Sequence, residues 1–174
     1  MLRILPVTLL ILFFSSCVGI PDNVEAVKGF ELKRYLGTWY EIARLDHTFE
    51  RGLTANVTAE YTMMEDGGMQ ILNRGQNPKT GEYSEAKGKG YLAAEPDIGR
   101  FKVAFFVPIY FGYNIIELDK ENYSYVMICG KDRSNFWILS RKPVLEKETF
   151  QKLVGRGKEL GFDTDNLIMI KHTP

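Results

Sequence analysis

The chain has 174 residues, with 22 Lys and Arg, 22 Asp and Glu, and a formal net charge of zero. This length suffices for one domain with its own hydrophobic core. Because no block of Lys and Arg occurs, we expect no nucleic-acid partner. Aromatic residues make up 13% of the chain, which suits either an apolar ligand pocket or an ordinary β-barrel core.

The N-terminus has the features of a targeting segment. Arg3 precedes the apolar run from Leu9 to Phe14, which is too short to span a bilayer as a mature helix. We predict that residues 1–16 are a lipoprotein signal peptide. The small residues before Cys17 resemble a lipobox, in which this cysteine is acylated and anchors the protein in the membrane. The alternative is a plain secretory signal followed by an incidental cysteine.

Residues 17–29 are predicted to be a short tether that holds a single domain, residues 30–174, slightly away from the membrane. The second cysteine, Cys129, has no partner for a disulfide within the chain if Cys17 is acylated. A lone cysteine in an oxidising compartment usually survives by burial. We therefore interpret Cys129 as a core residue, with a functional thiol as the alternative.

The first strand is predicted over residues 38–45, where β-branched and aromatic residues alternate with others. Residues 46–52 follow as a loop too long for a tight hairpin. His47 and Arg51 in this loop could contact an anionic head group, and the alternative is a solvated loop.

Four strands are predicted next. Over residues 54–64 the side chains of Val57, Ala59 and Tyr61 alternate with polar ones, a half-buried pattern. Asp66-Gly67-Gly68 then predicts a tight hairpin turn. The remaining three strands are predicted over residues 69–74, 82–93 and 100–106.

The run from Phe105 to Tyr113 is apolar but contains Pro108 and Gly112, so it must form a strand, a turn and another strand. Its apolar tip should lie at the same end as the loop over residues 46–52. It could be a ligand lid or a partner contact, or it could pack against neighbouring loops.

The C-terminal third of the chain completes the sheet. Strands are predicted over residues 113–118, 123–129 and 136–141, and a helix with one apolar face over residues 146–160. A last short strand over residues 167–170 should pair with the first. Eight antiparallel strands enclose an interior just wide enough for side chains or one small ligand.

Two distant residues predict that the sheet closes. An arginine at the end of the last long strand, Arg141, could lay its guanidinium across the ring of Trp39, a cation–π contact of about 0.5–2 kcal/mol. This contact requires the first and last strands to meet. Gly37-x-Trp39 with Arg141 resembles the signature of the lipocalin family. RYLGTWYEIARLDHTFERGL, the DGG turn, YNIIELD and WILSRKP resemble bacterial outer-membrane lipoprotein lipocalins, and the resemblance covers residues 30–170.

The resemblance implies an all-β fold, an eight-stranded antiparallel up-and-down β-barrel (the lipocalin calyx) with one C-terminal α-helix packed outside. Val18, which is not Asp, implies sorting to the outer membrane, with the barrel facing the periplasm. Trp39 and Arg141 are expected to be a structural barrel-closing pair. The residues expected to point inward or to lie at the rim and bind a ligand are Val57, Ala59, Tyr61, Val103, Phe105, Tyr110, Asn114, Ile116, Trp137 and Leu139.

These expectations predict a membrane-anchored protein that stores or transports fatty acids or lysophospholipids for outer-membrane maintenance. One alternative is a carrier of another apolar compound, such as a haem-like pigment or a signalling molecule. A further one is an enzyme using Cys129, Glu41 or Tyr110. No nucleophile elbow, metal-spaced His/Cys set or phosphate-binding glycine loop occurs, so we expect no catalytic residues, cofactor or metal. A homodimer could form through the apolar loops at the mouth.

Overall fold

A computed structural model describes residues 18–173, so the predicted signal peptide and Cys17 lie outside the described residues. Nine strands and two α-helices follow one another in the order predicted, except that the first helix was not expected. Their bounds are α1 Leu32–Tyr35, β1 Gly37–Arg44, β2 Ala55–Met63, β3 Met69–Gln76, β4 Tyr83–Leu92, β5 Arg100–Phe106, β6 Ile109–Leu118, β7 Tyr125–Cys129, β8 Phe136–Ser140, α2 Lys147–Glu159 and β9 Ile168–Met169.

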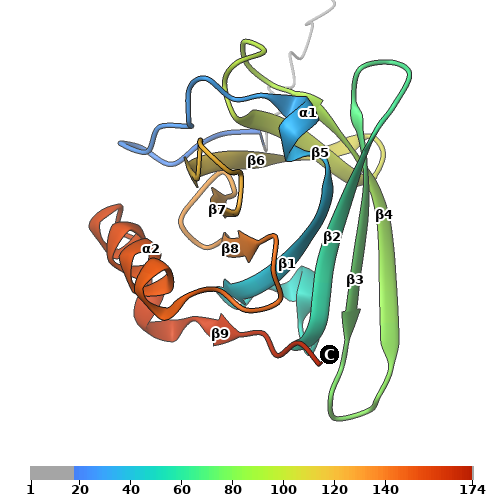
Figure 1. Cartoon of the computed structure of the whole chain (residues 1–174). Coiled ribbons are helices and arrows are strands. Elements are labelled where there is room, and N and C mark those ends of the chain that lie inside the picture. Colours follow the sequence, from blue (N-terminus) through green and yellow to red (C-terminus); the bar gives the residue numbers. More distant parts are fainter. Residues whose placement is uncertain (1–17, 174) are drawn as a thin grey trace, which may run out of the picture.

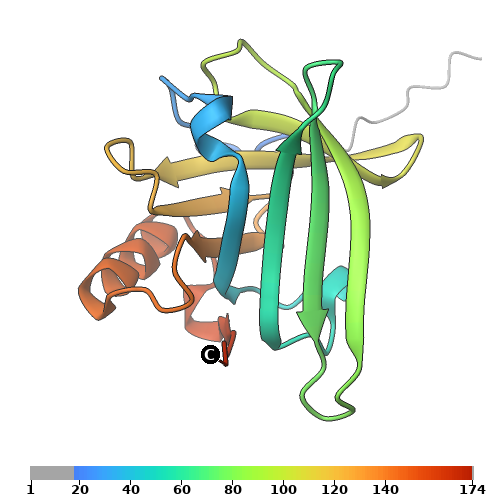
Figure 2. The ribbon, with the colours of Figure 1, turned by 45° about the vertical axis from the view of Figure 1, so that its right-hand side comes forward.

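The strands form one antiparallel sheet that closes on itself (Figures 1 and 2). Strands β2 to β8 pair in chain order, and β1 pairs with both β8 and β2, which completes the ring. The last strand, β9, adds to the other side of β1 at Ala43 and Arg44. The predicted eight-stranded up-and-down barrel with one external C-terminal helix is confirmed, as is the pairing of the last short strand with the first.

Most element bounds agree with the prediction to within two residues. The main difference is β6, which starts at Ile109 rather than at residue 113, directly after the two-residue turn Val107-Pro108. A turn this short leaves Ile109 and Phe111 inside the ladder, so the apolar tip is a narrow hairpin end and not a broad loop.

One end of the barrel is closed by the predicted pair. The guanidinium carbon of Arg141 lies 3.9 Å from the centroid of the Trp39 ring. The same guanidinium donates hydrogen bonds to backbone carbonyls of three segments, namely Arg34, Tyr35 and Leu36 in and after α1, Thr38 in β1, and Tyr123 in the turn before β7. Trp39 Nε1 donates to Tyr35 O at 2.8 Å. This end of the barrel is thus held by one cation that joins the first and last strands.

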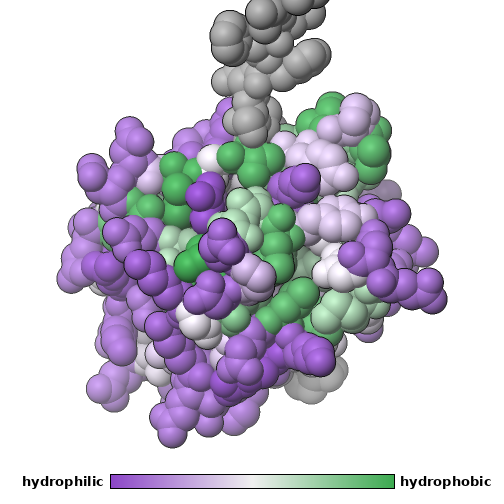
Figure 3. Space-filling view, turned by 90° about the horizontal axis from the view of Figure 1, so that it is seen from above, coloured by the Kyte–Doolittle hydropathy of each residue, from purple (hydrophilic) through white to green (hydrophobic). Residues whose placement is uncertain are grey.

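Gly37 explains the spacing of the Gly-x-Trp signature. Its φ of +95° lies in the left-handed region that favours glycine, and a Cβ there would lie 3.4 Å from Nη1 of Arg141. The glycine therefore lets the chain turn from α1 into β1 beneath the guanidinium. Seen from above, this end shows apolar side chains toward the middle and polar ones around them (Figure 3).

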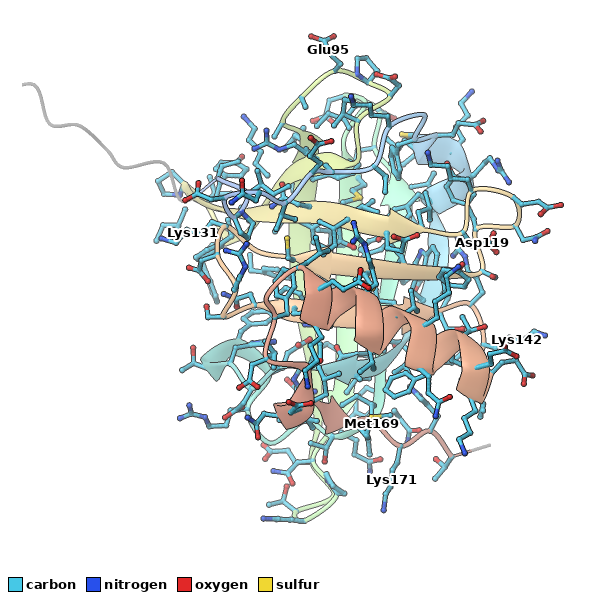
Figure 4. All side chains as sticks on the ribbon, turned by 90° about the vertical axis from the view of Figure 1, so that its left-hand side faces the viewer. Glu95, Asp119, Lys131, Lys142, Met169 and Lys171 are labelled. Carbon is cyan, nitrogen blue, oxygen red and sulfur yellow. The ribbon has the colours of Figure 1, made fainter. Side chains whose placement is uncertain are left out.

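Buried apolar side chains form two separate cores. One lies inside the barrel and includes Trp39, Tyr61 and Phe101. The other lies between the outer face of the barrel and α2, and includes Met127, Ile138 and Leu153. Figure 4 shows α2 lying across the strands on this outer face. Within residues 18–173, no helix is long and apolar enough to cross a membrane.

The segment predicted as a tether packs against the barrel in its described part, residues 18–29. Val27 N donates to Ile115 O, Gly99 N donates to Val27 O, and Arg133 Nη2 donates to Asp22 O. These residues therefore do not hold the barrel at a distance, contrary to the spacer role that was expected for them.

Replacing Trp39 with alanine tests the closure. We expect Trp39→Ala to lower the free energy of unfolding by about 3–5 kcal/mol, because a fully buried indole leaves a cavity and the guanidinium loses its ring. Urea denaturation measures the change, with Tyr83→Ala, which truncates an exposed aromatic residue, as control. Equal unfolding midpoints for the two variants would show that the pair does not hold the barrel closed.

Candidate ligand-binding site

The barrel contains a cavity of about 510 Å³, within the range of about 300–1,000 Å³ found for small-molecule pockets. It extends from tyrosines near the closed end to the loops at the other end, which we call the mouth. Residues of the loop after β1, the β5–β6 hairpin and the loop after β7 all line it. The turn between β7 and β8 therefore lies at the mouth, where Lys131 is found, at the opposite side of the barrel from Asp119 (Figure 4).

Most of the residues predicted to face a ligand line this cavity. They come from three strands, β2, β5 and β8, so the fold brings together positions that are far apart in the chain. The predicted residues in the lining are Val57, Ala59, Tyr61, Val103, Phe105, Trp137 and Leu139. Their role in binding stays a prediction, whereas their position in the cavity wall is established.

Asn114, Ile116 and Tyr110 are not in the lining, and the expected orientation of their side chains is wrong. Asn114 Nδ2 donates to Gly19 O at 2.7 Å, so this side chain holds the N-terminal segment against the outer face. Ile116 belongs to the outer core beneath α2. The ring of Tyr110 lies against Lys102, whose Nζ is 5.3 Å from the ring centroid, and is not part of the cavity wall.

The inward positions of β6 are shifted by one residue from those expected. Phe111 and Tyr113 line the cavity, and Ile115 belongs to the interior core. A strand with one solvated face shows which residues point inward by its alternation of apolar and polar side chains. On β6 both faces are covered, because α2 and the N-terminal segment lie outside, so residues 113–118 show no such alternation.

A buried charged cluster, formed by Glu41, Arg44, His47 and Glu50, stands at one wall of the cavity. Glu41 points inward, and its partner is Arg44, with Oε1 of Glu41 2.8 Å from Nη1 of Arg44. Both side chains are inward because the β1–β8 register shifts between Glu41 and Ala43. Such a bulge adds one residue to a strand and so reverses the alternation beyond it.

Arg44 also attaches the loop after β1 to the barrel. Its Nη2 donates to Glu50 O and to Leu53 O, both at 2.8 Å. Glu50 Oε2 lies 3.0 Å from His47 Nε2 and accepts a hydrogen bond from Trp137 Nε1 at 3.1 Å. Two side chains of the loop, those of His47 and Glu50, are therefore turned into the mouth, whereas most of its other residues are exposed to solvent. His47 lines the cavity, as the head-group hypothesis requires, whereas Arg51 is exposed and does not.

The two carboxyl groups of the charged cluster have opposite pKa shifts. Burial raises the pKa of Glu41 well above its usual range, the carboxylate of Glu50 raises it further, and Arg44 only partly offsets these effects. Burial would also raise the pKa of Glu50, but His47, the indole N–H of Trp137 and the charge of Arg44 together lower it. The pKa values of two carboxyl groups that share one arginine are thus shifted in opposite directions, upward for Glu41 and downward for Glu50.

Tyr61 and Tyr113 form the floor of the cavity, and Tyr35 lies behind them. The hydroxyl of Tyr113 lies 2.5 Å from that of Tyr35 and 2.9 Å from that of Tyr61. The rings of Tyr35 and Tyr61 are stacked, with centroids 5.4 Å apart, and Tyr35 also contacts Trp39. The floor of the cavity therefore rests directly on the barrel-closing pair.

The mouth is rich in exposed apolar side chains. Phe106 is 75% exposed and Val107 69% exposed at the end of the β5–β6 hairpin. Phe49 reaches across from the loop after β1, with its ring centroid 4.7 Å from that of Phe105. The hairpin thus continues the apolar wall of the cavity out to solvent, as expected for its tip.

Cys129 is fully buried in the outer core, and its side chain is not among those that line the cavity. Burial raises the pKa of its thiol to about 12. A thiol that stays protonated at neutral pH is a poor nucleophile. The interpretation of Cys129 as a core residue is confirmed.

The pKa of Glu50 predicts a pH dependence. A carboxyl group whose pKa is lower in the folded than in the unfolded state adds stability above its unfolded pKa, and this contribution disappears as the pH falls through the folded pKa. We expect the free energy of unfolding to fall less steeply with acidification in Glu50→Gln than in the wild type, as measured by urea denaturation between about pH 3 and pH 7. Glu65→Gln, in an exposed turn, is the control. If the free energy of unfolding depends on pH in the same way in Glu50→Gln and in the wild type, the pKa of Glu50 is not lowered by folding.

Comparison with known proteins agrees with this geometry. The family model for the lipocalin-like domain matches residues 30–172. The chain is 48% identical over 157 residues to the outer membrane lipoprotein Blc of Vibrio cholerae, covering 90% of this chain and 91% of that protein. It is 46% identical over 151 residues to the protein of the same name from Escherichia coli, covering 87% and 84%. Among solved structures, the cockroach allergen Per a 4 shares the fold, with a TM-score of 0.68, 19% identity and coverage of 88% of this chain and 96% of that chain. The chain therefore belongs to the lipocalin family.

Proposed function

We propose that this protein is a membrane-anchored carrier or store for fatty acids or lysophospholipids that serves maintenance of the outer membrane. The observation that carries the proposal is the cavity of about 510 Å³, which has mostly apolar walls and polar side chains at its mouth and at its floor. Lipocalins bind small hydrophobic ligands, and the apolar walls of this cavity support a lipid as the ligand.

An acyl chain can bind to an apolar cavity wall through burial of its hydrocarbon surface alone. Burial of apolar surface contributes about 25 cal/mol per Å², so a chain that fills the cavity needs no strong polar contact for micromolar affinity. Lys131 and Asn135 at the mouth are placed where an anionic or zwitterionic head group would meet solvent. The ligand would therefore lie with its chain inside and its head group at the mouth.

Catalysis is less well supported than binding. Of the three side chains considered for an enzyme, Cys129 and Tyr110 do not line the cavity, and Glu41 is paired with Arg44. The competing proposal is a carrier of another apolar compound, such as a pigment or a signalling molecule, because apolar walls alone do not distinguish these ligands from lipids.

The membrane anchor is a separate part of the proposal. The related proteins of Vibrio cholerae and Escherichia coli are named outer membrane lipoproteins, which supports acylation of Cys17 and attachment to the outer membrane, with the barrel in the periplasm. The exposed tip residues Phe106, Val107 and Ile109 would further support a homodimer in which two copies cover each other's mouths, a state that sedimentation analysis would reveal.

The bound molecule tests the carrier proposal. We expect Cys17→Ser protein, purified from a Gram-negative host without detergent, to yield fatty acids or lysophospholipids on solvent extraction and mass spectrometry. The matched control is Ala59→Phe, which narrows the cavity at an inward position and should carry clearly less lipid. An extract that contains a pigment, or equal lipid from both proteins, would contradict the proposal.

Removing the acylation site tests the anchor. Wild-type protein should fractionate with the outer membrane and incorporate labelled palmitate, whereas Cys17→Ser should incorporate none and remain soluble in the periplasm, because no acyl chains are left to partition into the bilayer. Cys129→Ser, at the buried cysteine, is the control and should stay labelled. A Cys17→Ser protein that still fractionates with the membrane would refute the anchor.

A further inference from the structure

The hydroxyl groups on the cavity floor hold a hydrogen that a ligand can receive. Among residues 18–173, the hydroxyls of Tyr35, Tyr61 and Tyr113 make two short hydrogen bonds, both with each other. Each of these bonds uses one hydroxyl hydrogen, and the third hydrogen can go either to the remaining pair, Tyr35 and Tyr61, or to a group inside the cavity. Tyr61 and Tyr113 line the cavity, so a group inside the cavity can receive it.

A second polar group nearby is unpaired. Asn73 lines the same cavity, and its Oδ1 is buried without a hydrogen-bond partner in the described part of the chain. In the β2–β3 ladder, Ile71 stands opposite Tyr61 and Asn73 stands opposite Ala59. Asn73 is therefore the diagonal neighbour of Tyr61 on the inner face, at a usual spacing of about 7–8 Å, which leaves room for a small polar group between them.

The floor offers hydrogen bonds but no free positive charge. The guanidinium of Arg141 is occupied by backbone carbonyls and by the Trp39 ring. The two Nη atoms of Arg44 bond to Glu41 and to the loop carbonyls, and its charge is balanced by the carboxylate of Glu50, 3.8 Å from Nε. Burial also raises the pKa of Tyr61 and Tyr113, which keeps their hydroxyls protonated. An ionised carboxylate at the floor would lose its hydration without gaining a cation.

A hydroxyl group satisfies all of these conditions. It can accept the third tyrosine hydrogen and donate its own hydrogen to Asn73, and it carries no charge. We propose that the floor of the cavity is a binding subsite for a hydroxyl group on the buried chain of the ligand, formed by Tyr61, Tyr113 and Asn73. This inference rests on the proposed lipid-carrier function and narrows its ligands to hydroxylated acyl chains.

The test compares hexadecanoic acid with a series of its monohydroxylated positional isomers. Dissociation constants are measured by titration calorimetry on delipidated Cys17→Ser protein, and on the same protein carrying Tyr61→Phe or Asn73→Leu. Tyr91→Phe is the matched control, because the hydroxyl of Tyr91 bonds to Asp66 outside the cavity. Two independent substitutions keep the test valid if one of them impairs folding.

We expect at least one isomer to bind about fivefold or more tightly than hexadecanoic acid, because it pairs a group that is otherwise left unpaired. This advantage should fall below about twofold in Tyr61→Phe or in Asn73→Leu, and should persist in Tyr91→Phe. The inference is overturned if no isomer gains affinity, or if the gain survives in both cavity variants. If hexadecanoic acid binds but no hydroxylated isomer binds more tightly, only this inference fails. If none of the acids binds, the proposed lipid-carrier function fails as well.

Discussion

The contact between Arg141 and Trp39 is the constraint on which the rest of this structure depends. The guanidinium covers the indole and donates to carbonyls in α1, β1 and the turn before β7. It therefore joins segments more than one hundred residues apart and closes one end of the ring. With that end closed, the barrel becomes a cup, whose floor is formed by Tyr61 and Tyr113, with the ring of Tyr35 stacked on that of Tyr61. The position of the cavity follows directly from the closure.

The interior combines a large apolar wall with two sets of polar groups, one near the mouth and one at the floor. At the wall near the mouth, Arg44 satisfies both Glu41 and the loop carbonyls, so this charge serves to hold the loop in place. At the floor, the hydroxyls of Tyr61 and Tyr113 bond to each other, and Asn73 Oδ1 is buried without a hydrogen-bond partner among residues 18–173. Buried polar groups are nearly always hydrogen-bonded in native proteins. The unpaired group at the floor is thus the one that a ligand would be expected to bind. The paired groups near the mouth hold the loop and the barrel together.

The residues that line the cavity could be predicted on strands where apolar and polar side chains alternate in the sequence. They could not be predicted on strands where this alternation is absent or interrupted. Val57, Ala59 and Tyr61 alternate with polar residues, and all three line the cavity as expected. On β6 the outer face is as buried as the inner one, so nothing in the order of residues distinguishes Asn114 from Tyr113. On β1 the bulge after Glu41 turns Arg44 inward, and no local pattern marks this position.

The sequence by itself determined the closed eight-stranded barrel, the external helix and the meeting of Trp39 with Arg141, because these depend on strand periodicity, turn residues and a short signature. Only the tertiary structure decided which face of β6 is inward, how Glu41 is paired and that the segment before α1 lies against the barrel. The physical reason is that each of these depends on what covers a strand from outside or shifts its register, and such contacts come from residues far away in the chain.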